Sequence, residues 1–230
     1  MSRLLTLERQ PRRSTPQDGA ILEHLARRDA WSRVRRPSYQ LQLLRDLAIL
    51  LPEGPCRILD IGTGSGLIGE AIAALFPGKS VTGVDVVRRT LPDLRIPFVR
   101  FDGSLLPFPD GAFDCALFCN VLHHVCPGDR AGLLREAVRV TGGGPILIKD
   151  HMTHGRLDDF RLWLLDFVGN APRGAMTSAQ YLGSPQWEEL LDGLDRVAEL
   201  LPPAAYRRSV WAWCFPNRLE ICLRVRPGSV

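Results

Sequence analysis

The chain begins with two amphipathic segments and then changes its rhythm. Over residues 17–51, apolar positions recur at helical spacing, which predicts two helices separated near Pro37. From residue 57 onward, short apolar runs alternate with loops and helical stretches. The runs that predict strands lie at 57–61, 81–86, 96–101, 113–121 and 145–149, and the clearest helices at 65–76 and 129–140. Such alternation predicts a parallel sheet with helices on both faces.

The last third of the chain departs from this alternation. Two helical stretches, 157–168 and 185–194, are followed by strand-like segments at 196–200 and 218–225. We expect an α/β fold with a doubly wound, seven-stranded, mostly parallel sheet. The expected parts of one domain, 1–230, are N-terminal helices (1–52), a core (53–150), a helical cap insertion (151–195) and C-terminal strands (196–230).

Composition and charge narrow the class of protein. The chain has 230 residues and an ordinary balance of apolar and charged residues, which predicts a globular protein with one sizeable core. No apolar run reaches the roughly 18 residues of a membrane span, and no apolar segment follows the N-terminus as in a secretory signal. We therefore expect no membrane contact and a cytoplasmic location. Residues 1–36 contain nine arginines and four acidic residues. The arginines are interspersed with apolar residues, which favours a solvated face over a nucleic-acid patch.

The six cysteines are scattered and include no CxxC pair, so we expect reduced thiols. Cys115, Cys119, His123, His124 and Cys126 resemble a set of metal ligands. Two of these thiols fall inside an apolar strand, where small buried cysteines are common. Tetrahedral zinc sites usually pair closer ligands across a turn. We therefore predict no metal site.

A glycine-rich turn, Asp60-Ile-Gly-Thr-Gly-Ser-Gly66, follows the first predicted parallel strand. Glycine allows positive φ and lets a ligand touch the backbone, while the helix that begins near Leu67 offers free N–H groups. Residues 64–69 also fit the GxGxxG pattern of dinucleotide folds, with Asp85 about twenty residues further on. An acid before the turn separates the two interpretations. Asp60 would repel a pyrophosphate but suits a ligand that carries an ammonium group and no phosphate.

This turn resembles motif I, (D/E)xGxGxG, of the class I (Rossmann-like) S-adenosylmethionine-dependent methyltransferases. The resemblance covers about residues 57–150, and further stretches at 106–114 and 135–144 are similar to the family's approaches to its next strands. The Thr141-Gly-Gly segment departs slightly from the family pattern. The resemblance implies S-adenosylmethionine as cofactor. It also implies a set of cofactor-binding residues: Asp60, Gly62, Gly64 and Gly66 in the turn, Asp85 for the ribose hydroxyls with Val86 after it, Asp102 for the adenine amino group with Gly103 after it, and Asn120 before the loop that lines the methyl-transfer site.

Two histidines and an acid follow neighbouring strands of the predicted sheet. His123 and His124 come after the 113–121 strand, and Asp150 comes after the 145–149 strand. Both loops lie at the carboxyl edge of a parallel sheet, where ligands bind. Some small-molecule members of the family use a histidine and an acid at these places, so we predict His123 as a base and Asp150 as its partner. The alternative is that the histidines pack against the cofactor or cap a helix. Lys149 is expected to face away or to pair with an acid.

We expect methyl transfer to a small metabolite of secondary metabolism by in-line displacement, with oxygen favoured over nitrogen or carbon as acceptor. We expect a lipophilic pocket between the N-terminal helices and the cap. Its expected aromatic lining is Trp163, Phe167, Tyr181 and Trp187, with Trp211 and Trp213 nearby. The same residues would also suit an ordinary core.

Three alternative functions are a catalytically silent partner subunit, a nucleic-acid methyltransferase using the Arg-rich N-terminus and a nicotinamide oxidoreductase. A homodimer is compatible with each of them.

Overall fold

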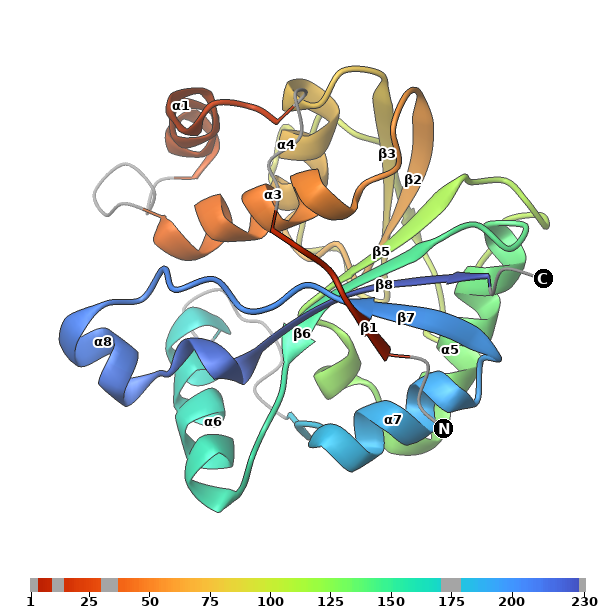
Figure 1. Ribbon diagram of the computed structural model, residues 1–230. Helices are drawn as coiled ribbons and strands as arrows, with labels where there is room; N and C mark the ends of the chain where they lie inside the picture. Colours follow the sequence, from red (N-terminus) through yellow and green to blue (C-terminus); the bar gives the residue numbers. More distant parts are fainter. Residues whose placement is uncertain (1–3, 10–14, 30–36, 171–178, 228–230) are drawn as a thin grey trace.

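The computed structural model describes residues 4–9, 15–29, 37–170 and 179–227. One sheet of eight strands crosses this part of the molecule, in the order β1-β7-β8-β6-β5-β2-β3-β4 (Figure 1). The strands are β1 (Leu4–Thr6), β2 (Cys56–Ile61), β3 (Lys79–Asp85), β4 (Phe98–Arg100), β5 (Cys115–Cys119), β6 (Ile146–His151), β7 (Arg196–Leu200) and β8 (Glu220–Pro227). β8 runs antiparallel to β6 and β7, and the other pairings are parallel.

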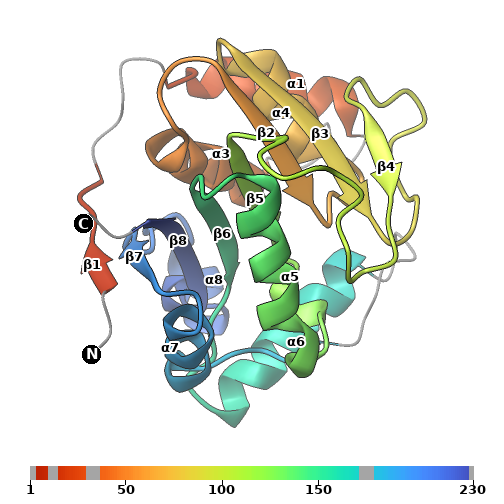
Figure 2. The same ribbon diagram turned by 90° about the vertical axis from the view of Figure 1, so that its right-hand side faces the viewer.

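Helices cover both faces of this sheet, as the doubly wound prediction requires. The described helices are α1 (Asp18–Arg28), α3 (Ser38–Leu50), α4 (Leu67–Leu75), α5 (Pro127–Val140), α6 (Arg156–Asn170), α7 (Ser184–Asp192) and α8 (Ser209–Cys214), with the short 3₁₀ turns η1 (Leu122–His124) and η3 (Asn217–Leu219). α1, α3 and α4 pack on one face, and α5 and α7 pack on the other (Figure 2).

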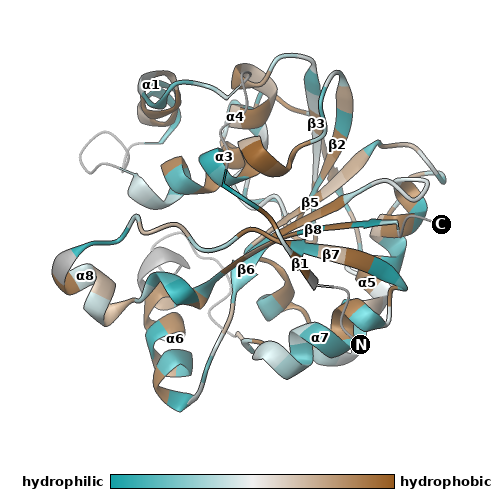
Figure 3. Ribbon diagram, in the orientation of Figure 1, coloured by the Kyte–Doolittle hydropathy of each residue, from teal (hydrophilic) through white to brown (hydrophobic). Residues whose placement is uncertain are grey.

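Strand β5 shows why the sheet is hydrophobic on both sides. Its side chains alternate, so that Cys115 and Leu117 join the core beneath α1, α3 and α4, while Ala116 and Phe118 join the core beneath α5 and α7. All four are fully buried. The hydrophobic colours accordingly follow the sheet and the helix sides that face it (Figure 3). A near-continuous apolar run is the pattern expected of a strand buried on both faces.

The eighth strand corrects the predicted count of seven. Residues Leu4–Thr6 form β1, which pairs in parallel with β7 over Leu4↔Ala198 to Thr6↔Leu200. This strand lies in the segment where only helices were expected. Three residues carry too little pattern to predict a strand, and their partner lies more than 190 residues away. The fold class itself, a mostly parallel, doubly wound α/β sheet, is confirmed.

The chain reverses direction across the sheet between β2 and β5. From β2 it proceeds outward to β3 and β4, and then it returns to build β5 and β6 on the other side of β2. Ligands in open α/β sheets bind at such a switch point, beyond the carboxyl ends of the strands. The turns that follow β2, β3 and β5 therefore frame the place to look for a site.

The segment expected to form a cap takes part in the main core. Trp187 of α7 is 2 % exposed and packs among the buried residues of β5, β6 and β8, and its ring N–H donates to the carbonyl of His151 at 3.4 Å. α6 lies past the carboxyl end of β6 (Figure 1). The boundaries 1–52, 53–150, 151–195 and 196–230 stay predictions, and residues 171–178 of the cap lie outside the described part. Among the described residues, no helix is both long and apolar enough to cross a membrane.

Candidate active site

The glycine-rich turn after β2 has the backbone that its sequence predicted. Gly62, Gly64 and Gly66 have φ values of 72°, 56° and 78°. Residues that carry a Cβ rarely adopt this backbone conformation. A Cβ at Gly62 would lie 2.6 Å from a methyl carbon of Val121, so the turn packs closely against the end of β5. A Cβ at Gly64 would meet nothing within 4 Å. The backbone at Gly64 is therefore open to a ligand.

Asp85 ties the end of β3 to this turn. Its Oδ2 accepts the N–H of Gly64 at 2.9 Å, and its Oδ1 accepts the N–H of Val87 at 3.2 Å. The carboxylate is nearly buried, and Val86 follows it at the strand end. A charged acceptor therefore stands beside the open backbone of the turn.

Asp60 lies beneath the turn instead of facing its open side. It is buried, and Thr63 Oγ1 donates to its Oδ2 at 2.6 Å. Burial raises the pKa of Asp60 to about 6, against the opposing effect of the Thr63 hydrogen bond. The Asp60 carboxylate is therefore engaged with the turn itself, and its expected role toward a ligand stays a prediction.

Asp102 lies in an exposed turn after β4. Its Oδ1 accepts the N–H groups of Ser104 at 2.8 Å and Leu105 at 3.0 Å, and these bonds lower its pKa. Gly103, with a φ of 95°, follows it, and a Cβ there would lie 3.2 Å from a methyl carbon of Val86. One carboxylate oxygen of Asp102 thus shapes the turn that closes over the end of β3.

Asn120 marks the end of β5 with a left-handed backbone, φ 57°. Its side chain is within hydrogen-bond distance of the hydroxyl of Tyr39 in α3, at 2.9 Å from the amide oxygen and 2.7 Å from the amide nitrogen. Burial raises the pKa of Tyr39 well above its ordinary value. The contact brings the N-terminal helix α3 to the edge of the sheet at which the glycine-rich turn also lies.

His123 and Asp150, predicted as base and partner, are in contact. Nδ1 of His123 lies against Oδ1 of Asp150, and both side chains are fully buried. The backbone fixes the carboxylate, because Leu122 N–H donates to its Oδ2 at 2.9 Å and His151 N–H to its Oδ1 at 2.7 Å. Burial lowers the pKa of His123, but Asp150 and Asp166 outweigh it and raise that pKa to about 9. The imidazole is therefore oriented by a fixed carboxylate.

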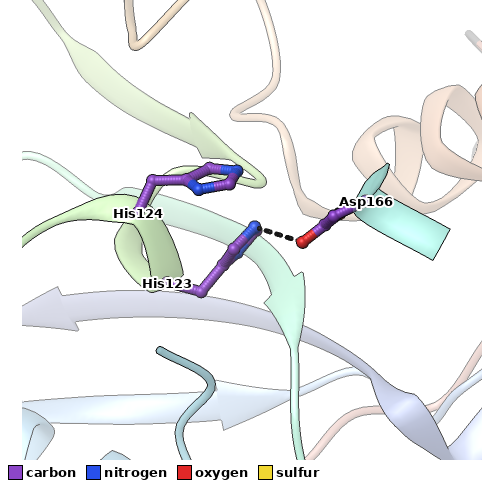
Figure 4. A group of neighbouring side chains, drawn as sticks. All are labelled: His123, His124 and Asp166. Atoms are coloured by element: carbon purple, nitrogen blue, oxygen red, sulfur yellow. Dashed lines mark ion pairs between the residues drawn. The ribbon is translucent and has the colours of Figure 1, made fainter. Parts of the chain in front are cut away.

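Three residues that sequence reasoning did not single out as active surround this pair. Asp166 of α6 places Oδ2 at 3.2 Å from His123 Nε2, and Tyr181 donates its hydroxyl to the same oxygen at 2.5 Å. His151 lies with Nε2 at 3.9 Å from Asp166 Oδ1, and burial lowers its pKa. Figure 4 shows Asp166 reaching from α6 toward the two histidines after β5. A helical-face argument could have found Asp166, because it lies one turn from the fully buried Leu162.

Lys149 pairs with an acid, one of the two options expected for it. Its ammonium group contacts the Glu220 carboxylate of the neighbouring strand β8, and both are buried. Burial raises the pKa of Glu220, but Lys149, His151 and Arg207 outweigh it and lower the pKa to about 2. Lys149 is thus a charge partner inside the sheet.

The aromatic residues divide between a pocket and the core. A pocket of about 420 Å³ is lined by Asp159, Phe160, Trp163, Ala179, Gln180 and Tyr181. The rings of Phe160, Trp163 and Phe167 stack along α6 and stay half-exposed. Trp187 was expected to line the pocket but belongs to the core, while Trp211 and Trp213 are exposed on α8. Tyr181 connects this pocket to Asp166 and His123.

Two comparisons with known proteins agree with this geometry. Residues 59–148 match the family model described as a methyltransferase domain. The likeness to the class I S-adenosylmethionine-dependent methyltransferases that the sequence predicted thus recurs in this family model and in the fold of solved structures. It is similar to a human N-acetylserotonin methyltransferase solved in complex with S-adenosylmethionine, with a TM-score of 0.54 and 18% identity over 93% of this chain and 57% of that one. A methyltransferase structure from Thermotoga maritima gives a TM-score of 0.61 at 18% identity, covering 92% of this chain and 100% of that one.

Curated proteins are similar to parts of this chain. A demethylmenaquinone methyltransferase of Thermus thermophilus is 32% identical over 113 residues, which cover 45% of this chain and 50% of that protein. An uncharacterised methyltransferase of Mycobacterium tuberculosis is 25% identical over 173 residues, covering 72% of this chain and 87% of that protein. The match thus spans only half the length of the Thermus protein.

The residues at the switch point fit S-adenosylmethionine, the cofactor of this family. The open backbone at Gly64 and the nearly buried Asp85 carboxylate beside it suit a ligand with ribose hydroxyls and no phosphate. When bound, the cofactor supplies an electrophilic methyl group on a sulfonium. The individual roles of the nine cofactor-binding residues stay predictions.

Proposed function

We propose that the methyltransferase moves a methyl group from S-adenosylmethionine to a hydroxyl oxygen of a small, lipophilic or aromatic metabolite. The observation that carries this proposal is the contact of His123 with Asp150 beside the aromatic pocket at Tyr181. Burial of the imidazole excludes water from the reacting groups, and Asp150 holds the ring in one orientation.

The proposed reaction balances within this site. The acceptor oxygen forms a bond to the methyl carbon as the carbon–sulfur bond breaks, and the sulfonium becomes a neutral thioether. The hydroxyl proton passes to Nε2 of the neutral form of His123, the nitrogen opposite the one that Asp150 contacts. Because the pKa of His123 is about 9, we expect the rate to rise with pH up to about that value. Asp166 is 3.2 Å from that nitrogen, so an acceptor hydroxyl would have to insert beside the Asp166 carboxylate.

The acceptor class has two supports. The half-exposed rings of Phe160 and Trp163 in the pocket wall favour a flat, lipophilic ligand. The Thermus relative is named for demethylmenaquinone, which is consistent with an acceptor that carries an aromatic ring. The alternatives are a nitrogen or a carbon atom as the methyl acceptor.

The described arginines of the N-terminal region do not favour a nucleic-acid substrate. Arg9 pairs with Asp46 at 2.7 Å, and Arg28 pairs with Glu70 and Asp93. These charges are satisfied within the chain, although residues 1–3, 10–14 and 30–36 lie outside the described part. A silent partner subunit, a homodimer and the cytoplasmic location stay predictions.

The test is transfer of a labelled methyl group to matched acceptors. Sets of small aromatic compounds that differ only in carrying a hydroxyl, an amino or a methoxy group are incubated with the protein and methyl-labelled cofactor. The proposal expects label in the hydroxyl compounds of at least one set and none in the methoxy compounds. Label on amino or ring-carbon positions alone would contradict the oxygen acceptor, and label in no set would favour the silent subunit.

A further inference from the structure

A group of three side chains at this site has the composition of a metal-ion site. His123 and His124 come from η1 after β5, and Asp166 comes from α6 (Figure 4). One potential ligand atom from each of the three lies within 4.8 Å of the other two. Of the histidine, cysteine and acidic side chains that the structure describes, only these three form such a group, and none of them is a thiol.

His123 supplies an independent sign that this group is built for a ligand. Its side chain is fully buried, and Nε2 has Asp166 Oδ2 as an ion-pair partner at 3.2 Å but makes no hydrogen bond of good geometry. A buried polar nitrogen without a hydrogen bond costs free energy unless a hydrogen-bond partner or a bound ion satisfies it. Nε2 points at Asp166, at a separation that two ligands of one ion commonly have (Figure 4).

The surroundings orient the ligands as they do in known metal centres. Asp150 contacts Nδ1 of His123, which leaves Nε2 to serve as the donor atom. Tyr181 holds Asp166 through its hydroxyl at 2.5 Å. The carboxylate–histidine contact on the far side of a ligating ring is the usual support of zinc-bound histidine.

The two imidazoles and one carboxylate select the class of ion. Imidazole nitrogen suits zinc, copper, iron and nickel, whereas magnesium and calcium prefer oxygen ligands alone. Three protein ligands leave a fourth position open, as in catalytic zinc sites. The donor set therefore favours a divalent transition-metal ion, with zinc as the simplest probe.

We propose that His123 Nε2, His124 and Asp166 bind one divalent transition-metal ion, with Asp150 as the support of His123. This inference shares His123 with the proposed function but does not rest on methyl transfer. An ion and a proton exclude each other at Nε2. In a loaded protein His123 would be a ligand and could not take the acceptor's proton, so the base role belongs to the metal-free protein. The proposal departs from the prediction of no metal site, which the structure does not test.

The test is zinc binding to the full-length protein after metal ions have been removed with a chelator. Calorimetry with zinc chloride should give one ion per chain, and the affinity should fall by roughly tenfold or more in Asp166→Asn and in His124→Ala. His154→Ala and Cys126→Ser serve as controls, because these side chains are exposed and lie outside the group. Both controls should bind zinc as tightly as the unchanged protein.

Two readouts keep the outcome decisive. S-adenosylhomocysteine binding reports whether each variant is folded, and it does not depend on which acceptor the enzyme uses. Cobalt binding to the unchanged protein needs no substitution, and its spectrum should lack thiolate charge-transfer bands. No stoichiometric binding, equal affinity in Asp166→Asn, or thiolate bands that disappear in Cys126→Ser would each overturn the proposal. Zinc binding without methyl transfer would leave the metal site standing and reject the proposed function alone.

Discussion

The carboxylate of Asp150 contacts the imidazole of His123, although 27 residues separate them in the sequence. The two lie at the carboxyl ends of neighbouring parallel strands, β6 and β5, which bring their loops together. Two backbone N–H groups hold the carboxylate from the other side. The position of His123 is thus set by the sheet itself.

Asp150→Asn should therefore impair the reaction more than it impairs cofactor binding. The amide cannot stabilise a charged imidazole and favours the wrong tautomer of the ring, so we expect kcat to fall by ~10²–10⁴-fold. Steady-state kinetics and calorimetry with S-adenosylhomocysteine check the two effects. Asp110→Asn is the control, because that carboxylate is exposed. A variant with unchanged kcat would refute the role of Asp150.

Asp85→Ala should weaken the binding of S-adenosylhomocysteine. Loss of a charged hydrogen-bond acceptor costs ~1.5–3 kcal/mol, or roughly a tenfold to hundredfold loss of affinity. Asp85→Asn should cost less, because its amide oxygen can still accept the Gly64 N–H. Calorimetry measures the three proteins, with Asp110→Ala as the control. Equal affinities would remove Asp85 from the cofactor site, and tight binding of NADH would contradict the cofactor.

Gly62→Ala and Gly64→Ala form a matched pair. Both positions have positive φ, so alanine costs ~1–2 kcal/mol of stability at either one. Only Gly62 also faces Val121, at 2.6 Å from its new Cβ, and this overpacking should cost ~1–3 kcal/mol more. Urea unfolding measures the difference. If Gly64→Ala proved the less stable variant, the described packing of the turn against β5 would be wrong.

Glu220→Gln should destabilise the fold in a pH-dependent way. It leaves Lys149 buried without its charge partner, which costs ~3–5 kcal/mol. The folded-state pKa of Glu220, about 2, lies below the ordinary 4.5, so its stabilising effect is present above pH 4.5. That effect is lost as the pH falls toward 2. Unfolding of both proteins at pH 7 and pH 3 should show a smaller difference at pH 3, and an equal or larger one would contradict the assignment.

The fold was predictable where local pattern determined it. The strands from β2 to β6 were recognised because each is a short apolar run bounded by turn residues, and Asp85 and His123 could be placed because they follow such runs. β1 could not be predicted, because Leu4–Thr6 become a strand only by pairing with β7.

The rest of the candidate site depends on tertiary contacts. Helical periodicity places Asp166 on a buried face but does not show that it meets His123, and no local pattern places Tyr181 beside the same ring. Trp187 was assigned to a pocket because the apolar face of a helix has the same spacing whether it meets a ligand or a core. Helical periodicity shows that a face is buried but does not show what buries it.

The central claim, that His123 and Asp150 lie at the acceptor side of the cofactor, is tested most directly by a crystal structure. Crystals would be grown with S-adenosylhomocysteine and soaked with an aromatic hydroxy compound that the labelling assay identifies. The account predicts the cofactor at Gly64 and Asp85, and the acceptor oxygen between its sulfur and His123, within reach of Nε2 or of an ion held there. An acceptor bound away from His123, with its oxygen facing other side chains, would contradict it.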